Sequence, residues 1–269
     1  MIYEKVYLYP DRKDVFLETY CFERGVCQKS DAMLILPGGG YQFVSDREGE
    51  PIVRAFAAQG FNCFVLTYSI RDKALFPQPL LDAAMAMKHI RENADRYNIN
   101  PEKICAVGFS AGGHLCGMLG NMWHLPVLSE TIGVPSEVFR PTCVLLIYPV
   151  ITAYEYAHIG SIQTVVGTQA TVKSLATVSV DPSVVSLEKN ITEKSVPAFL
   201  LHTADDGVVP VENTLLAAHA YHKAGVPFEV HIYPFGPHGI SIAKEETGPA
   251  EPSVAEWPRL ATAFCRRFL

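Results

Sequence analysis

Short, uninterrupted apolar runs recur along the chain and alternate with longer segments of helical spacing. Six runs predict strands, at residues 32–37, 61–68, 104–109, 144–149, 198–202 and 226–233. They are continuous rather than alternating, which is typical of parallel strands covered by helices on both faces. Two earlier segments, Ile2–Tyr9 and Val15–Phe22, are more amphipathic, and we expect them to form an antiparallel pair at one edge of the sheet.

The segments between these runs carry helical spacing. Apolar positions from Leu80 to Tyr97 step by three and four, so they share one helix face. Further helices are predicted at residues 112–123, 211–224 and 254–268. Alternation of strands and helices predicts an α/β fold with a mostly parallel twisted sheet and helices on both faces. No interdomain linker is visible, so we expect one domain over residues 1–269.

Two segments break this rhythm. Residues 125–142 are of mixed polarity, and residues 151–195 have no strong period and are rich in Thr, Val and Ser. Loops of this length within a compact domain are usually functional or contain small helices of their own. We therefore expect residues 151–195 to form a small, cap-like insertion near the functional site.

Composition narrows the class of protein. With 49% hydrophobic and 19% charged residues, the chain can bury a large core. Its 22 Lys and Arg against 28 Asp and Glu give a net charge of −6, which argues against nucleic acid or an anionic membrane as a partner. We read no membrane span, signal peptide or disulfide framework, which makes the cytoplasm the simplest compartment. Cys63, Cys105 and Cys143 lie in apolar runs and are expected to be buried thiols.

The strongest chemical signal is Gly108-Phe109-Ser110-Ala111-Gly112, which fits the pattern G-x-S-x-G. It follows a predicted strand and precedes a predicted helix, which is the context that this motif requires. The glycines permit a tight turn that exposes the Ser110 hydroxyl. The sequence therefore predicts Ser110 as a nucleophile rather than as a bystander in a glycine-rich turn.

A serine nucleophile needs a base, and the base needs an orienting acid. His238 lies in a Pro/Gly loop after the last predicted strand and is the best candidate base. His202 ends an apolar strand, where packing or loop orientation is the more plausible role. Asp205 and Asp206 follow that strand, and either could be the acid or could cap the next helix.

Three successive glycines, Gly38 to Gly40, follow the strand at residues 32–36. Their backbone N–H groups can turn toward a ligand without side-chain obstruction. The amides of Gly39 and Gly40, together with that of Ala111, could hold an oxyanion. No Gly-Lys-Ser/Thr follows, so the segment is not a phosphate-binding Walker loop.

Together, the segments 37–41, 108–115, 204–210 and 236–239 resemble those of α/β-hydrolase esterases. The likeness is greatest to the acetyl-xylan-esterase-like branch, which is related to BD-FAE and hormone-sensitive-lipase-type esterases. This resemblance implies Ser110 as nucleophile, His238 as base and Asp206 as acid, since the family's acid lies four residues before the proline that is Pro210 here. It also implies Gly39, Gly40 and Ala111 as oxyanion donors.

One position departs from the family pattern, because Pro37 stands where many relatives have the histidine of His-Gly-Gly-Gly. The support of the glycine loop must then come from elsewhere. Arg47 and Glu48 either pair to fix that loop or form a solvated helix start.

The resemblance implies a serine esterase that removes small acyl groups, mainly acetyl, from carbohydrate such as acetylated xylo-oligosaccharide, without cofactor or metal. Tyr41, Tyr154 and Tyr156 are candidates for lining the substrate. The alternatives are a general short-chain carboxylesterase, lipase or amidase, and a catalytically silent binding protein on the same fold. A homo-oligomer is compatible with the sequence.

Overall fold

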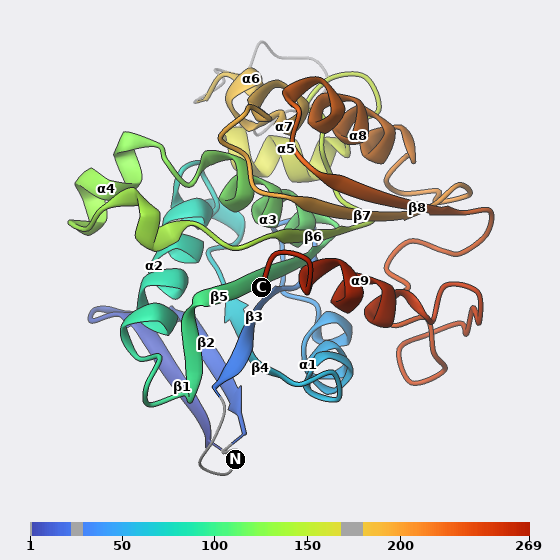
Figure 1. The fold of residues 1–269 in the computed structure, drawn as a ribbon. Coiled ribbons are helices and arrows are strands. Elements are labelled where there is room, and N and C mark those ends of the chain that lie inside the picture. Colours follow the sequence, from blue (N-terminus) through green and yellow to red (C-terminus); the bar gives the residue numbers. More distant parts are fainter. Residues whose placement is uncertain (1, 23–28, 168–179) are drawn as a thin grey trace.

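An eight-stranded sheet in the order β1-β2-β4-β3-β5-β6-β7-β8 forms the centre of the computed structural model, which describes residues 2–22, 29–167 and 180–269 (Figure 1). The strands are β1 Ile2–Tyr9, β2 Arg12–Cys21, β3 Ser30–Leu36, β4 Phe61–Thr67, β5 Ile99–Phe109, β6 Val144–Ile147, β7 Ala198–Thr203 and β8 Phe228–Tyr233. From β4 to β8 all neighbours are parallel. The predicted antiparallel edge pair is confirmed, because β1 pairs with β2, and β2 joins it to β4.

Helices cover both faces of this sheet (Figure 1). They are α1 Glu50–Ala57, α2 Gln78–Glu92, α3 Ala111–Met122, α4 Pro126–Ile132, α5 Ile159–Val166, α6 Pro182–Val185, α7 Leu187–Asn190, α8 Glu212–Ala224 and α9 Trp257–Cys265. The buried residues of α2, α3 and α8 belong to one hydrophobic cluster, and those of α1 and α9 belong to the other. In the described part of the chain, no helix has both the length and the apolar character that crossing a bilayer requires.

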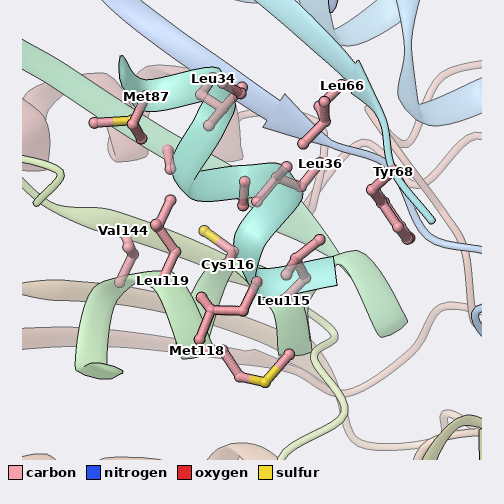
Figure 2. Packing of buried hydrophobic residues seen from close by; sticks show 14 of the residues in the cluster. Leu34, Leu36, Leu66, Tyr68, Met87, Leu115, Cys116, Met118, Leu119 and Val144 are labelled. Carbon is pink, nitrogen blue, oxygen red and sulfur yellow. The ribbon is translucent and has the colours of Figure 1, made fainter. Parts of the chain in front are cut away.

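The two clusters follow from the alternation of side chains along each strand. On β3, Leu34 and Leu36 face α2 and α3, whereas Met33 and Ile35 enter the cluster of α1 and α9. Figure 2 shows Leu34 and Leu36 in the same cluster as Met87 of α2 and Leu115 of α3. Since both strand faces are buried, the strand reads as a continuous apolar run, and each fully buried Leu contributes about 1.5–3 kcal/mol.

Some element boundaries differ from the predicted ones. Strand β5 starts at Ile99 rather than at residue 104, because Ile99 pairs with Ser30 and a register shift then absorbs the intervening residues. Helix α9 starts at Trp257 rather than at residue 254 and has Pro258 in its first turn, where proline is tolerated. Helix α2 ends at Glu92, before the predicted end at Tyr97.

Two helices were not predicted from the sequence. Helix α1 follows a 3-10 turn at Asp46–Glu48 and buries Ile52, Val53 and Phe56, so its apolar face is short but regular. Helix α4 lies in the mixed segment 125–142, where Leu128 is its only buried residue. Both are too short for their periodicity to stand out from the surrounding residues.

The segment 151–195 lies between β6 and β7 and contains α5, α6 and α7. Helix α7 contacts α3 and α8, and the three small helices gather at the same end of the molecule as α8 (Figure 1). Residues 168–179 lie outside the described residues. The expected small helices are therefore present, and the function of the segment as a cap stays a prediction.

Candidate active site

Ser110 occupies a sharp turn between β5 and α3, with φ +52° and ψ −117°. Residues other than glycine rarely adopt this backbone conformation. The turn depends on its flanking glycines. A Cβ on Gly108 would lie 2.1 Å from the Gly112 carbonyl oxygen, and a Cβ on Gly112 would lie 2.1 Å from the Leu36 carbonyl oxygen. The motif therefore makes close backbone packing possible, and Ser110 is held at the carboxyl end of β5.

Three side chains from separate loops form a hydrogen-bonded relay. The Ser110 hydroxyl lies 2.8 Å from His238 Nε2, and His238 Nδ1 lies 2.7 Å from Asp206 Oδ2. A carboxylate can only accept, so Nδ1 carries the proton and donates it to Asp206, which leaves Nε2 to accept from Ser110. The structure thus brings together the serine, histidine and aspartate that the sequence singled out.

The two neighbouring aspartates have different partners. Asp206 Oδ1 accepts the N–H groups of Val208 and Val209, each at 2.9 Å, while its other oxygen faces His238. Asp205 Oδ1 instead accepts the N–H of Gly236 at 2.8 Å, within the loop that carries the histidine. Asp205 therefore fixes that loop, and Asp206 contacts the imidazole.

His202 lies beside Asp206, in keeping with the packing or loop-orienting role considered for it. The side chain of His202 is fully buried, and its Nδ1 lies 2.8 Å from the Thr214 hydroxyl. Its Nε2 donates to the Val209 carbonyl at 2.9 Å and also lies 3.4 Å from Asp206 Oδ2. Burial opposes ionisation of Asp206, but hydrogen bonds from His202 and His238 outweigh burial and hold the pKa of Asp206 below its usual range. Asp206 is therefore an ionised acceptor at neutral pH.

The glycine loop is supported by a buried carboxyl group. Glu48 is only 3% exposed; its Oε2 accepts the N–H of Gly38 at 2.7 Å, and its Oε1 accepts the Tyr148 hydroxyl at 2.7 Å. The hydroxyl of Tyr68 donates to the Pro37 carbonyl at 2.6 Å. Glu48, Tyr148 and Tyr68 thus provide the support that the replaced histidine leaves open.

Glu48 fixes the loop without the expected partner. Its carboxyl group is buried rather than solvated, and among the described residues no ion pair joins it to Arg47. Burial raises the pKa of Glu48, and the hydrogen bonds from Tyr148 and Gly38 offset this only in part. The sequence expectation of a supported loop is therefore met by Glu48 and two tyrosines instead of by an Arg47–Glu48 pair.

Replacing Glu48 with Gln should lower the free energy of unfolding by about 1–3 kcal/mol, measured by urea denaturation at pH 7. A glutamine amide has one acceptor oxygen for the two donors, so its NH2 group would face either the Gly38 N–H or the Tyr148 hydroxyl. Glu50→Gln is the matched control, because Glu50 is exposed and should change stability little. Equal effects from the two variants would contradict the assigned support.

Gly39 and Gly40 line the same pocket as Ser110, and both have positive φ, +127° and +64°. A Cβ on Gly39 would lie 2.1 Å from the Phe43 carbonyl oxygen, so the loop folds tightly on itself. Ala111 is the first residue of α3, where backbone N–H groups have no acceptor within the helix. These are the three positions that the sequence predicts as oxyanion donors.

Tyr41, expected at the substrate, is placed differently. Its side chain is fully buried, and its hydroxyl donates to His114 Nδ1 at 2.8 Å. His114 Nε2 in turn donates to the Val185 carbonyl at 2.6 Å, which fixes this direction. A ring with no exposed surface cannot contact a molecule in the pocket, so Tyr41 instead joins the glycine loop to α3 and the 151–195 segment.

His114 should make the protein less stable in acid. Burial lowers the pKa of His114 to about 4 from its ordinary value near 6.5, so the unfolded chain binds a proton that the folded chain excludes. The contribution of the neutral His114 to the free energy of unfolding is fully present above pH 6.5. It falls by about 3 kcal/mol as pH drops toward 4. Urea unfolding at pH 7 and pH 4.5 should show this loss, and His114→Gln should reduce it. An unchanged pH dependence in the variant would contradict the assignment.

The site opens into a pocket of about 350 Å³ at the carboxyl ends of the parallel strands. Its walls come from the glycine loop, the Ser110 turn, the His238 loop and the start of α5. The lining residues are Gly39, Gly40, Gln42, Phe43, Ser45, Arg47, Glu48, Ser110, His158, Gly160, Val208 and His238. Tyr154 and Tyr156 are 46% and 41% exposed, and neither is among these described lining residues.

A cluster of sulfurs lies away from this pocket. The Sγ atoms of Cys105, Cys143 and Cys265 lie within 4.8 Å of one another, the only grouping of potential metal ligands found in residues 2–22, 29–167 and 180–269. All three thiols are buried, as expected for Cys105 and Cys143, and they pack as small apolar side chains. Two other potential metal ligands, His219 and His222 of α8, are exposed and are not part of this grouping.

The parallel strands, the tight serine turn and the loop-borne acid and histidine define an α/β-hydrolase fold. The BD-FAE family model matches residues 25–220, so the chain belongs to the BD-FAE family.

Named relatives agree with this membership. Endo-1,4-beta-xylanase B of Butyrivibrio fibrisolvens is 38% identical over 81% of this chain, and an acetylxylan esterase of Xylanibacter ruminicola is 30% identical over 78%. These matches span only 34% and 41% of the two relatives. The crystal structure of an acetyl ester-xyloside bifunctional hydrolase from Caldicellulosiruptor lactoaceticus has a TM-score of 0.84 and 33% identity, and covers 98% of this chain and 96% of its own.

Proposed function

We propose that this chain is a serine carboxylesterase that hydrolyses small acyl esters, chiefly acetyl esters of carbohydrate such as acetylated xylo-oligosaccharide. The observation that carries this proposal is the relay from Ser110 through His238 to Asp206, at 2.8 and 2.7 Å. These distances suit proton transfer from a hydroxyl to an imidazole.

In the proposed reaction, Ser110 Oγ attacks the ester carbonyl while His238 Nε2 takes the hydroxyl proton. The amides of Gly39, Gly40 and Ala111 would stabilise the oxyanion, at roughly 3–4 kcal/mol for one such donor. His238 then gives its proton to the leaving alcohol, and an acyl group remains on Ser110. A water molecule, deprotonated by the same imidazole, releases the acid and restores Ser110. No step needs a cofactor or a metal ion.

Two considerations support a small acyl group on a sugar alcohol. A pocket of about 350 Å³ is at the small end of the usual range for ligand sites. Relatives of the chain include proteins named as an acetylxylan esterase and an acetyl ester-xyloside hydrolase. A general short-chain carboxylesterase is the second candidate, because Phe43 and Val208 give the same pocket apolar surface without sugar-specific chemistry.

We further propose that residues 151–195 are an insertion within a single catalytic domain. His158, which precedes its first helix, and Gly160 within that helix line the pocket beside Ser110. The insertion would therefore form one wall of the substrate site.

The test is acetate release from acetylated xylo-oligosaccharide, run beside aryl esters of two to eight acyl carbons. The proposal expects acetate release from the sugar and rates on the aryl esters that fall with chain length. Turnover of the aryl esters alone would favour the general carboxylesterase. No turnover of any ester would overturn the proposed function and favour a silent binding protein.

A further inference from the structure

His158 lines the pocket but has no part in the proposed relay. It is the residue before α5, and its Nδ1 accepts the backbone N–H of Ser161 at 3.4 Å, which caps the helix. The same nitrogen lies 2.8 Å from the hydroxyl of the buried Ser161. The ring is therefore fixed by one nitrogen, and only the other is left for a ligand.

The cap also determines which nitrogen carries the proton. Because Nδ1 accepts from a backbone N–H, the proton of the neutral ring is on Nε2. Burial lowers the pKa of His158, and repulsion from His238 lowers it further, so the ring is neutral at pH 7. Nε2 has no hydrogen-bond partner among the described residues.

The ring lies beside the proposed oxyanion loop. Cβ atoms built on Gly40 and Gly160 would each lie 3.9 Å from His158 Cε1, so both glycines leave the imidazole edge uncovered. Two other polar lining side chains have protein partners, since Gln42 donates to the Thr164 hydroxyl at 2.7 Å and Arg47 reaches the Thr247 carbonyl at 3.5 Å. The Nε2–H of His158 is thus a neutral donor that the protein itself leaves unused.

Building on the proposed esterase function, we propose that His158 Nε2–H binds a free hydroxyl adjacent to the ester on the alcohol half of the substrate. His158 and His238 line the same pocket, and His238 Nε2 would protonate the leaving alcohol, so we place His158 beside that half. The preferred substrates are then monoesters of vicinal diols, the arrangement that partly acetylated sugars present. His158 is a residue of substrate specificity rather than a member of the relay.

The test uses two esters that differ by a single hydroxyl, trans-2-hydroxycyclohexyl acetate and cyclohexyl acetate. We expect kcat/KM of the native protein to favour the hydroxylated ester by about tenfold, in line with one well-formed hydrogen bond. His158→Asn should abolish this preference by lowering kcat/KM for the hydroxylated ester to that for cyclohexyl acetate. Asparagine is a strong helix N-cap, so the start of α5 is kept while the Nε2–H is removed.

Gln42→Ala is the matched control, because it removes another polar lining side chain and should retain the preference. Retention of the tenfold preference by His158→Asn, whether the two rates stay the same or fall equally, would overturn the role of His158. Equal rates of the native protein on the two esters would also overturn it while leaving the esterase intact. No turnover of either ester by the native protein would overturn the proposed function itself.

Discussion

Replacing Ser110 with Ala lowers kcat for acetyl ester hydrolysis by about 10⁴-fold or more, since loss of a serine nucleophile leaves only binding and oxyanion stabilisation. Ala keeps the same strained backbone turn, so the thermal unfolding midpoint should move little. Release of 4-nitrophenol from 4-nitrophenyl acetate, corrected for spontaneous hydrolysis, measures the loss. A variant within tenfold of the native rate would show that Ser110 is not the nucleophile.

The two aspartates should respond very differently to the same chemical change. Asp206→Asn is expected to lower kcat by about 10⁴-fold, because the amide can still accept the N–H groups of Val208 and Val209 but then turns its NH2 group toward His238. That arrangement favours the tautomer with the proton on Nε2, which cannot accept from Ser110.

Asp205→Asn is the matched control in the same loop. Its amide oxygen can still accept the Gly236 N–H, so kcat should fall less than tenfold. Steady-state kinetics of the two variants on one acetyl ester show which of the two aspartates orients His238. A severe loss in Asp205→Asn with a mild one in Asp206→Asn would exchange the roles of these residues.

The strands and the serine turn could be predicted because their signals are local. Gly108 and Gly112 lie four residues apart around Ser110, and the buried β3 is a continuous apolar run. The order of serine, acid and histidine is likewise visible along the chain. The choice of Asp206 over Asp205 needed the family resemblance, since both follow the same strand and only their partners distinguish them.

The rest depends on contacts between residues far apart in sequence. Glu48 accepts the N–H of Gly38 in the glycine loop and is itself held by the hydroxyl of Tyr148, which lies 100 positions away. Tyr41 is buried, with its ring packed edge-on against Tyr68 and His114, and no pattern near residue 41 indicates this. His158 lies in an aperiodic segment, and only the fold brings it to the pocket.

The central claim is that Ser110 is activated by His238 and Asp206, and covalent labelling tests it most directly. The protein would be treated with a fluorophosphonate, digested and examined by mass spectrometry. We predict a single phosphonyl adduct on the peptide that carries Ser110, and at least 100-fold slower labelling in His238→Ala. An adduct on a different residue, or equally fast labelling of Ser110 without His238, would contradict the account.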